Sequence, residues 1–327
     1  MSKYDFLTIG GATEDITFNT NEGKLVSDEE IPGQKLLAFR YGSKIKIEEA
    51  HSSFGGGAAN SAVNFARLGL KTASIVVVGK GNRDKRILQN LRSQGVNTRW
   101  TQKKDRESGF SFLLVGPGNE HIVFSNRAAN RELRLTDHYR TPLMGTDWVY
   151  LTSLSGEWQA VLKKLFSLPD LKIAWNPGHV QLKSGINKLS RYLKKTKILF
   201  VNREEAIELL LTKKKYKDKP DSFFKNIKNI LKALKETGPE MVVVTRGKKG
   251  ANAYDGDKFY YQKKVAEKKK VDTTGVGDAF NSSLVAGLKL YDGDIQKAMQ
   301  LGARNAASVI EKEGAQNGLL TSQAVKK

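Results

Sequence analysis

The chain has 327 residues, 39% of them hydrophobic, which is enough for a large packed α/β domain and argues against disorder. It has no cysteine, so disulfides, thiolate zinc sites and a cysteine nucleophile are excluded, and a reducing compartment suits it. The N-terminal residues predict a strand rather than a signal peptide, and no apolar run approaches the roughly 18 residues that a membrane span needs. We therefore expect a cytoplasmic protein without a membrane partner.

The formal charge of +21 raises the question of a nucleic-acid partner, because such a field attracts polyanions. The lysines are dispersed over segments with the pattern of exposed helix faces, with two clusters at 213–219 and 263–270. No zinc finger, aromatic-interleaved stretch or other nucleic-acid module accompanies them, which argues against nucleic acid as the partner. A polyanion-binding protein is retained as the alternative from a different functional class.

In chain order, the first predicted strand is 6–11. The stretch 14–53 follows, with short apolar segments at 16–18, 35–39 and 44–50 and no helical pattern. The sequence FGGGAAN at 54–60 then opens an amphipathic helix that Gly69 ends.

A buried strand is predicted at 73–79 and a helix at 82–95. The next stretch, 108–125, is typical of a hairpin around the turn Gly116-Pro117-Gly118-Asn119. Further short runs of valine, isoleucine and leucine without polar alternation predict strands at 147–154, 172–177, 197–202 and 241–247. The lysine-rich segment 213–221 is expected to be an exposed loop.

Strands that alternate with helices predict an α/β fold, in which a doubly wound, mostly parallel sheet is flanked by helices. We expect residues 1–327 to form one domain. The stretches 14–53 and 108–125 interrupt the alternation and are expected to form a small inserted antiparallel β-sheet. Such a sheet beside a binding edge would act as a lid that excludes water from the ligand.

The strongest chemical signal is DTTGVGDAF at 272–280, where Gly275 and Gly277 precede an apolar-periodic helix. Closely spaced glycines before a helix let consecutive backbone N–H groups face one anion, aided by the helix dipole. Asp278 falls in the first helical turn, where a carboxylate is stabilised as an anion and could accept a proton from a hydroxyl group. A helix-capping aspartate after a tight turn explains the segment equally well.

A second glycine-rich segment, FGGGAAN, lacks the lysine of a Walker A loop, so it is not a P-loop. Gly55, Gly56 and Gly57 permit close approach of the backbone to a ligand, and Asn60 offers a donor and an acceptor to a hydroxyl group. A simple strand-to-helix turn is the alternative for this segment.

Together, FGGGAANSAVNFARLG and DTTGVGDAF resemble the two signatures of the ribokinase-like (PfkB) carbohydrate kinase family, in the same order and far apart. The segments between and after them also resemble that family: GNEHIVFSNRAANREL, WNPG, VNREEAIELL, TRGKKGANAY and GAQNG. The resemblance covers nearly the whole chain. It implies a ribokinase-like fold with a lid, and ATP-dependent phosphorylation of a hydroxyl group of a small carbohydrate.

The resemblance also implies a role for each matching residue. Asp278 is similar to the general base, and the N–H groups of Gly275, Val276 and Gly277 are similar to the anion hole for the transferred phosphoryl group. Asp15, Gly55, Gly56, Gly57 and Asn60 are expected to bind the sugar. The nucleotide is expected to contact Asn202, Glu205, Thr245, Arg246, Gly247, Gly250 and Asn305.

Cofactors follow from the same resemblance. ATP is the expected donor, and Mg²⁺ is expected near Glu205, held through water. Some relatives bind K⁺, mostly through backbone carbonyls, at positions that correspond here to Asp272, Thr274, Val309, Lys312 and Gly314.

The acceptor is left open among three classes. A free sugar is the main expectation, although the first strand ends in GGATED where ribokinase itself carries an asparagine-containing element. An adenosine-type nucleoside kinase is the alternative, with Phe18, Phe39 and Phe54 as either a slot for the base or core of the lid. A sugar phosphate would need a cationic grip from Arg40, Arg127 or Arg131. The exposed edges of a lid sheet also suggest a homodimer.

Overall fold

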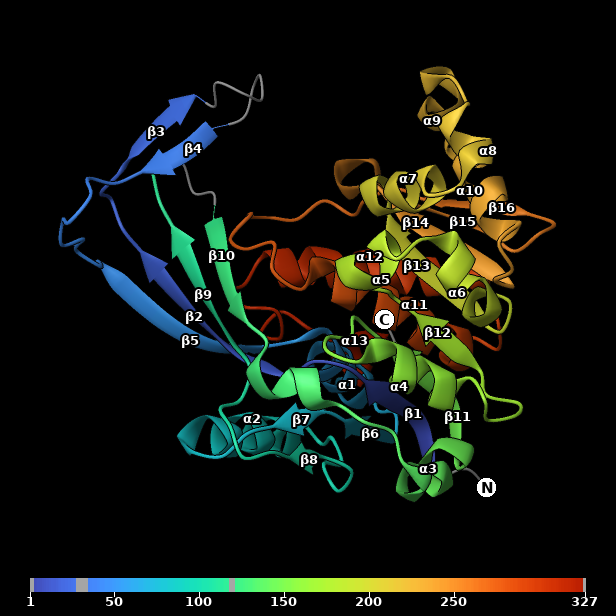
Figure 1. Ribbon diagram of the computed structural model, residues 1–327, viewed down its shortest axis with the longest axis horizontal. Coiled ribbons are helices and arrows are strands. Elements are labelled where there is room, and N and C mark those ends of the chain that lie inside the picture. The colour runs from blue at the N-terminus through green and yellow to red at the C-terminus, as the bar shows by residue number, and fades with distance from the viewer. Residues whose placement is uncertain (1–2, 28–34, 118–120, 326–327) are drawn as a thin grey trace.

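The computed structural model describes residues 3–27, 35–117 and 121–325, whose strands form two main sheets and two short two-stranded ones (Figure 1). The larger is an eight-stranded sheet in the order β16-β15-β14-β13-β12-β11-β1-β6. Its strands are β1 (Tyr4–Ile9), β6 (Thr72–Ile75), β11 (Thr146–Leu151), β12 (Ile173–Trp175), β13 (Ile198–Asn202), β14 (Met241–Thr245), β15 (Ala251–Tyr254) and β16 (Phe259–Gln262). The six strands β14, β13, β12, β11, β1 and β6 pair in parallel, and β15 and β16 join the edge of the sheet antiparallel.

Helices cover both faces of this sheet, because its strands are apolar on both sides. In β1, Phe6 packs on one face, where its ring stacks on Phe65 with a centroid distance of 4.0 Å, while Leu7 and Ile9 pack on the other. The Phe6 face carries α1 (Gly57–Arg67), α11 (Val276–Leu290), α12 (Ile295–Ile310) and the short α13 (Ser322–Val325). The predicted doubly wound, mostly parallel sheet is confirmed.

The opposite face carries the helices of the middle of the chain, seen in green and yellow in Figure 1. These are α3 (Arg140–Met144), α4 (Trp158–Leu165), α5 (His179–Lys183), α6 (Ile186–Leu193), α7 (Arg203–Leu211), α8 (Lys214–Lys217), α9 (Asp221–Lys225) and α10 (Ile227–Lys235). The remaining α2 (Asn82–Ser93) packs beside α1, near the short strands β7 (Val77–Val78) and β8 (Gln102–Lys103). Single turns of 3₁₀ helix lie at η1 (Ala128–Glu132), η2 (Asp137–Tyr139) and η3 (Gly247–Lys249).

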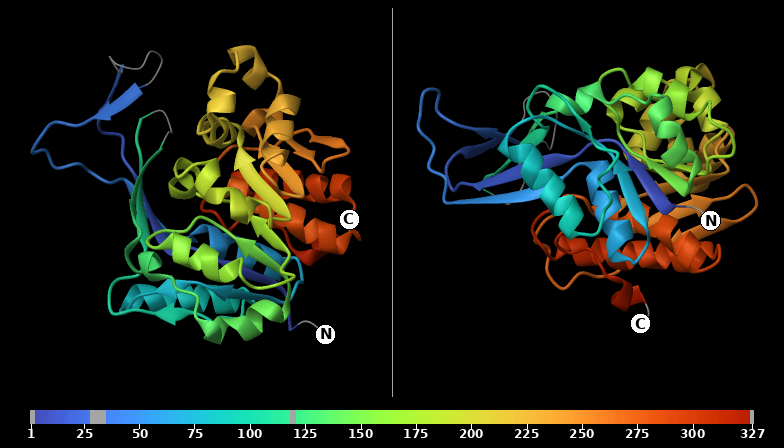
Figure 2. Two further views of the ribbon diagram at one scale, coloured as in Figure 1. Left: turned by 45° about the vertical axis from the view of Figure 1, so that its right-hand side comes forward. Right: turned by 90° about the horizontal axis from the view of Figure 1, so that it is seen from below.

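The smaller sheet, which we call the lid, projects from the core as a single layer in both views of Figure 2. It has the order β10-β9-β2-β5, and its strands are β2 (Thr13–Asn19), β5 (Glu49–Gly55), β9 (Phe110–Val115) and β10 (His121–Asn126). The inserted sheet is confirmed, but it is not wholly antiparallel. The two central strands, β2 and β9, run parallel, because each carries the chain outward from the core while β5 and β10 bring it back.

Three details of the sequence interpretation were wrong. Residues 35–39 do not join the lid: β4 (Lys35–Ala38) pairs with β3 (Lys24–Ser27) in a separate two-stranded ribbon. The strand expected at 44–50 begins only at Glu49 and runs to Gly55. The loop expected at 213–221 contains α8, because Tyr216 is buried and bonds to the Ala233 carbonyl oxygen at 3.2 Å. Part of the predicted hairpin turn, Gly118 and Asn119, lies outside the described residues.

In the described ranges, no helix combines the length and apolar character that crossing a bilayer requires.

Candidate active site

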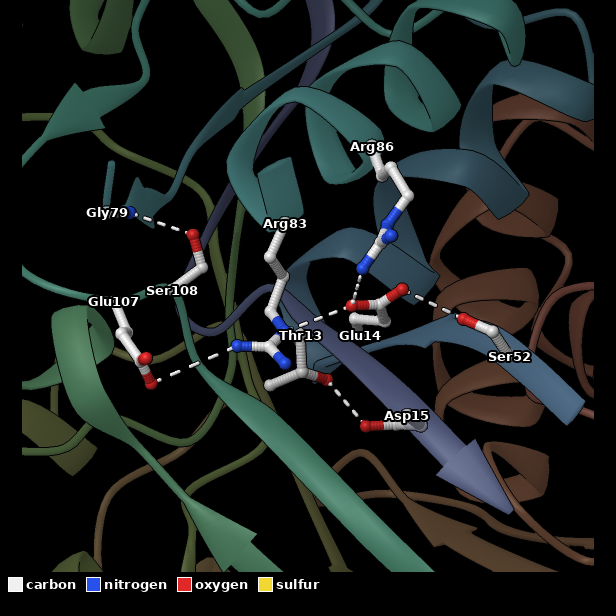
Figure 3. Close-up of polar contacts among 9 residues, drawn as sticks. All are labelled: Thr13, Glu14, Asp15, Ser52, Gly79, Arg83, Arg86, Glu107 and Ser108. Atoms are coloured by element: carbon white, nitrogen blue, oxygen red, sulfur yellow. Dashed lines mark hydrogen bonds and ion pairs between the residues drawn. The ribbon is translucent and has the colours of Figure 1, made fainter. Parts of the chain in front are cut away.

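The base of the lid holds two adjacent carboxylates on opposite sides of β2 (Figure 3). Successive residues of a strand point to opposite faces, so Asp15 faces Gly55 at the end of β5 and Glu14 faces α2. Thr13 donates a hydrogen bond of 3.0 Å to Asp15 Oδ1. Burial raises the pKa of the Asp15 carboxyl, although hydrogen bonds from Ser111 and Thr13 and the charge of Arg127 oppose that shift.

Two glycines of FGGGAAN lie too close to their neighbours to carry a side chain. A β-carbon on Gly55 would lie 1.9 Å from Asp15 Oδ2, and one on Gly56 would lie 2.5 Å from the Gly11 carbonyl oxygen. Gly56 also has a φ of 90°, which residues other than glycine rarely adopt. These contacts let β5 turn directly into α1 beside Asp15. They bring the predicted sugar-binding residues Asp15, Gly55, Gly56 and Gly57 to one corner of the molecule.

Asn60 and Asp278 meet across that corner, although 218 positions separate them in the sequence. Asn60, in the first turn of α1, donates a hydrogen bond of 2.8 Å from Nδ2 to Asp278 Oδ2. Burial raises the pKa of the Asp278 carboxyl, and the charge of Asp15 adds to that shift, while the hydrogen bond from Asn60 opposes it. The two predicted signatures are therefore joined through one contact beside a second carboxylate.

The turn before α11 depends on a glycine at position 275. Gly275 is left-handed with a φ of 74°, and a β-carbon there would lie 2.4 Å from the Ala315 β-carbon. A β-carbon on Gly277 would meet nothing within 4 Å, so the absence of a side chain leaves open space at the helix N-terminus. The Val276 N–H makes only a long hydrogen bond of 3.5 Å to the Thr273 carbonyl oxygen. An anion at this N-terminus could replace that bond.

A first hollow, which we call the lid cleft, lies between the lid and the core and has a volume of about 740 Å³. The lid contributes Thr17, Asn19 and Ser53 to its wall, so hydroxyl and amide groups predominate there. The core contributes the segment from Lys269 to Thr273 and the loop at Gly314 and Asn317. Such a polar wall suits a ligand rich in hydroxyl groups.

A second hollow, which we call the α12 cleft, lies over the C-terminal ends of β13 and β14 and has a volume of about 410 Å³. One wall is apolar, made by Phe280, Ala303, Ala307 and Ile310. Four of the predicted nucleotide-binding residues also line this cleft: Asn202, Thr245, Gly247 and Gly250. Two residues of the predicted anion hole, Val276 and Gly277, line it as well. Lys270 and Thr273 line both hollows, so the two clefts meet at the segment that precedes Gly275.

Asn202 and Glu205 form a capping box at the start of α7. The Glu205 N–H donates to Asn202 Oδ1 at 2.8 Å, and the Asn202 N–H donates to Glu205 Oε2 at 2.8 Å. Burial raises the pKa of the Glu205 carboxyl. Asn202 lines the α12 cleft but Glu205 does not, so the carboxylate lies behind the edge of the cleft.

Besides Glu205, two more of the predicted nucleotide contacts do not line the α12 cleft. Asn305 is fully buried, and its amide donates to Asn64 Oδ1 at 2.7 Å and to Ser283 Oγ at 2.6 Å. Its carbonyl oxygen accepts from the Leu320 N–H at 2.9 Å, so the side chain joins α1, α11 and α12 and does not reach a cleft. Arg246 is absent from the residues that line the α12 cleft, and its backbone N–H closes the turn to Gly250 at 2.8 Å.

The candidate potassium residues are close together around Asp272. One oxygen, Oδ1, accepts from the Thr274 N–H at 2.8 Å and its hydroxyl at 2.7 Å, and Oδ2 accepts from the Gly314 N–H at 2.9 Å. The Val309 carbonyl oxygen accepts from the Lys312 N–H at 3.1 Å. In the described part of the chain, no three histidine, aspartate or glutamate side chains converge as a metal site.

Sequence reasoning missed an ion cluster that ties the lid to α2 (Figure 3). Glu14 exposes only 1% of its surface, and Oε2 accepts hydrogen bonds from Arg83 at 3.0 Å and Arg86 at 2.7 Å. Its other oxygen accepts from Ser52 of β5 at 2.8 Å. The only signals in the sequence were two arginines three positions apart on a helix and an acidic residue beside Asp15, which do not specify a contact.

Comparison with known proteins places these features in a family. Residues 28–322 match the family model described as pfkB family carbohydrate kinase. A stretch of 260 residues is 28% identical to an uncharacterized sugar kinase of Archaeoglobus fulgidus, covering 79% of this chain and 98% of that protein. A nucleoside kinase of Methanocaldococcus jannaschii is 25% identical over 287 residues, which are 85% of this chain and 86% of the relative.

Solved structures show the same fold. The structure of Arabidopsis thaliana ribokinase complexed with ribose and ATP superposes with a TM-score of 0.82 at 18% sequence identity, over 100% of this chain and 98% of that one. The eight-stranded core with its separate lid is therefore a ribokinase-like fold.

Proposed function

Because the chain belongs to the pfkB family of carbohydrate kinases, we propose that it transfers the γ-phosphoryl group of ATP to a hydroxyl group of a small sugar, with Asp278 as the general base. The observation that carries this proposal is the contact between Asn60 and Asp278 beside Asp15. It joins the two glycine-rich signatures at one carboxylate. Asp278, Asn60 and Asp15 line neither cleft, but Gly277, the residue before Asp278, lines the α12 cleft, and Thr273 lines both clefts.

Asp278 has the properties of a base for an alcohol. Asn60 donates to Oδ2 and thereby orients the carboxylate, so that Oδ1 accepts the proton of the attacking hydroxyl group. Burial raises the pKa of Asp278, which strengthens it as a base. Asp15, held by Thr13, would orient the acceptor through its other hydroxyl groups.

The donor would occupy the α12 cleft. Its apolar wall of Phe280, Ala303 and Ala307 suits the faces of an adenine ring, and the N-terminus of α11 suits the phosphates. The N–H groups of Gly275, Val276 and Gly277 would face the charge that develops on the transferred group. The space beside Gly277 supports this role, because a side chain there would occupy the path of the phosphates.

Mg²⁺ fits as an ion held mainly by the nucleotide. No acidic cluster in the described residues would bind it directly, and Glu205 lies one step behind the cleft with one oxygen committed to Asn202. The ion would neutralise phosphate charge during transfer. For K⁺, both oxygens of Asp272 are occupied by hydrogen bonds that shape the turn, so the ligands from Asp272, Thr274, Val309, Lys312 and Gly314 would be backbone carbonyls.

A sugar fits the lid cleft better than a nucleoside. The three phenylalanines considered for a base slot are absent from the residues that line the lid cleft. Phe18 stacks on Phe112 on the face of the lid opposite Thr17 and Asn19, Phe54 pairs with Glu14 on that same face, and Phe39 lies against Gly23 beside the ribbon. Among the arginines considered for binding a sugar phosphate, Arg127 is close enough to Asp15 for its positive charge to lower the pKa of that carboxyl group.

We also propose that two copies pair through the outer lid face, defined as Ile16, Phe18, Phe112, Leu114, Ile122 and Phe124. Strand register places these side chains together on the side away from the lid cleft. Phe124 exposes 56% of its surface and Ile122 exposes 41%, on a layer that projects from the core (Figure 2). Burying such an apolar face against a second copy would stabilise the lid.

A coupled ADP-release assay across ribose, fructose, 2-keto-3-deoxygluconate, adenosine and fructose 6-phosphate tests the proposed function. We expect the highest kcat/KM for one of the phosphate-free sugars or sugar acids. Turnover confined to adenosine would replace the acceptor class but keep Asp278 as base. Absence of turnover on every acceptor, together with salt-sensitive RNA binding, would support the polyanion-binding alternative instead.

A further inference from the structure

Three amide side chains form a hydrogen-bonded chain that ends at Asp278. Asn90 of α2 donates from Nδ2 to Gln316 Oε1 at 2.8 Å. Gln316, in the loop between α12 and α13, donates from Nε2 to Asn60 Oδ1 at 3.0 Å. Asn60 in turn donates from Nδ2 to Asp278 Oδ2 at 2.8 Å. Helix α2, the loop between α12 and α13, and helix α1 are therefore connected to the Asp278 carboxylate by one continuous chain of hydrogen bonds.

The direction of this chain is determined by its chemistry. An ionised carboxylate can only accept hydrogen bonds, so Asn60 must present its NH₂ group to Asp278. The Asn60 oxygen then points at Gln316, which must donate, and the Gln316 oxygen is left to accept from Asn90. Reversing any amide would place two acceptors against each other, or two donors. Gln316 thus excludes the orientation in which the Asn60 oxygen would face Asp278.

Gln316 is itself firmly held. It exposes 6% of its surface, and its backbone carbonyl oxygen accepts a hydrogen bond from Arg67 Nη1 at 2.7 Å and another from the Leu319 N–H at 3.2 Å. The Arg67 Nε is fixed by Gln94 Oε1 at 2.7 Å. These bonds fix the backbone of Gln316, and its buried side chain bonds to Asn90 at one end and Asn60 at the other, so it can hold the amide of Asn60 in one orientation.

We propose that Gln316 is a positioning residue for phosphoryl transfer: it fixes the amide of Asn60 so that Asn60 donates to Asp278 Oδ2 and leaves Oδ1 to the acceptor. This role rests on the proposed function of Asp278. Gln316 acts through Asn60 and is absent from the residues that line either cleft in the described part of the chain.

The other groups that act on Asp278 electrostatically do not come from the amide chain. The negative charge of Asp15 on β2 raises the pKa of Asp278, and the charge of Asp278 in turn raises the pKa of the buried Tyr150 phenol on β11. Neither group changes when Gln316 is replaced. A shift of the Asp278 titration in a Gln316 variant therefore reports the loss of the oriented Asn60 bond, which favours the ionised carboxylate.

The test replaces Gln316 with methionine, which is similar in volume but cannot donate. The titration of Asp278 is followed by NMR on ¹³C-labelled aspartate in the ligand-free protein, with Asp278→Asn to assign the signal. We expect the Asp278 pKa to rise in Gln316→Met and, to a smaller extent, in Asn90→Ala. With an active acceptor, kcat/KM for that acceptor should fall roughly tenfold, with its acid limb moved to higher pH, while the ATP-analogue affinity stays within twofold.

Gln94→Met is the matched control, since it makes the same change of residue type and removes the hydrogen bond from Arg67 Nε but has no contact with Asn60. It should leave the Asp278 titration unchanged. The proposal is overturned by an unshifted Asp278 signal in a folded Gln316→Met protein. If that variant does not fold, an unshifted signal in Asn90→Ala has the same consequence. The NMR arm needs no turnover, so an inactive wild-type protein would contradict the proposed function without deciding the role of Gln316.

Discussion

Gly55 packs directly against Asp15, so that a β-carbon on Gly55 would lie 1.9 Å from Asp15 Oδ2. The last residue of β5 thereby limits the position of the carboxylate on the neighbouring strand. Asp15 keeps its place because Gly55 has no side chain and because Thr13 donates to its other oxygen.

Gly55→Ala should displace Asp15 and lower kcat/KM for the acceptor about 100-fold, the cost of a misplaced reacting group. The affinity for an ATP analogue, measured by calorimetry, should stay within twofold because the α12 cleft is untouched. Gly11→Ala is the control, since a β-carbon there has no neighbour closer than 4.0 Å. Equal acceptor kinetics in both variants would contradict the role of Asp15.

The Glu14 cluster should make the protein sensitive to acid. Burial opposes ionisation of Glu14, but hydrogen bonds from Arg86, Ser52 and Arg83 outweigh it, and its pKa lies below the ordinary value of 4.5. The stabilisation is complete above that value and is lost as the pH falls through the lower pKa of the folded state.

Glu14→Gln should lower the free energy of unfolding at pH 7 by about 2 kcal/mol, because two arginines lose a buried anionic partner. The difference in unfolding free energy between this variant and the wild type should shrink below pH 4.5, which urea titrations at a series of pH values would measure. As the control, Glu132→Gln removes an exposed partner of Arg106 and should cost below about 0.5 kcal/mol. A difference that does not depend on pH would show that charge is not the cause.

Two variants of Glu205 separate its capping role from its role toward Mg²⁺. Glutamine preserves the capping box, so Glu205→Gln should keep the melting temperature of the wild type. Its lost charge should raise the Mg²⁺ concentration for half-maximal turnover about tenfold. Glu205→Ala should show the same Mg²⁺ effect and also lose about 1 kcal/mol of stability. If Glu205→Gln has the Mg²⁺ response of the wild type, Glu205 is a helix cap alone.

The proposed dimer has a direct measurement. Light scattering should give about twice the chain mass of 36.3 kDa for the wild type, and Phe124→Asp should shift it toward one chain by placing a charge on the outer lid face. Tyr261→Asp, at another exposed aromatic residue on β16, should leave the mass unchanged. A wild-type protein that scatters light with the mass of a single chain would contradict the proposed dimer.

The sequence predicted the core because local patterns determine it. Runs such as 241–244 are apolar throughout and are flanked by helical periodicity, so their burial on both faces follows from composition alone. The glycines at 55, 56 and 275 were also predictable, since each has a close approach or a positive φ that only glycine tolerates. The lid was predictable as a sheet, but its parallel central pair was not, since pairing depends on where the strands leave the core.

Contacts between distant segments could not be predicted. Asn305 occupies a helix face that could equally point into a cleft, and only packing shows that it joins Asn64 and Ser283. Gln316 lies in the GAQNG segment that the family resemblance includes, but no local pattern connects it with Asn60. The contacts of Asn305 with Asn64 and of Gln316 with Asn60 each join residues more than 200 positions apart, and a single sequence does not encode those pairings as a pattern.

The central claim is that Asp278 removes the proton of the acceptor hydroxyl group. The most direct test is kcat for Asp278→Asn with ATP and the best acceptor, beside the melting temperature and the ATP-analogue affinity. Burial raises the pKa of Asp278, so its ionised form opposes folding at neutral pH, and the neutral variant should melt at the same temperature or higher. We predict that kcat falls by about 10²–10⁴-fold while the ATP-analogue affinity stays within twofold. A folded Asp278→Asn protein with near-normal kcat would contradict the account.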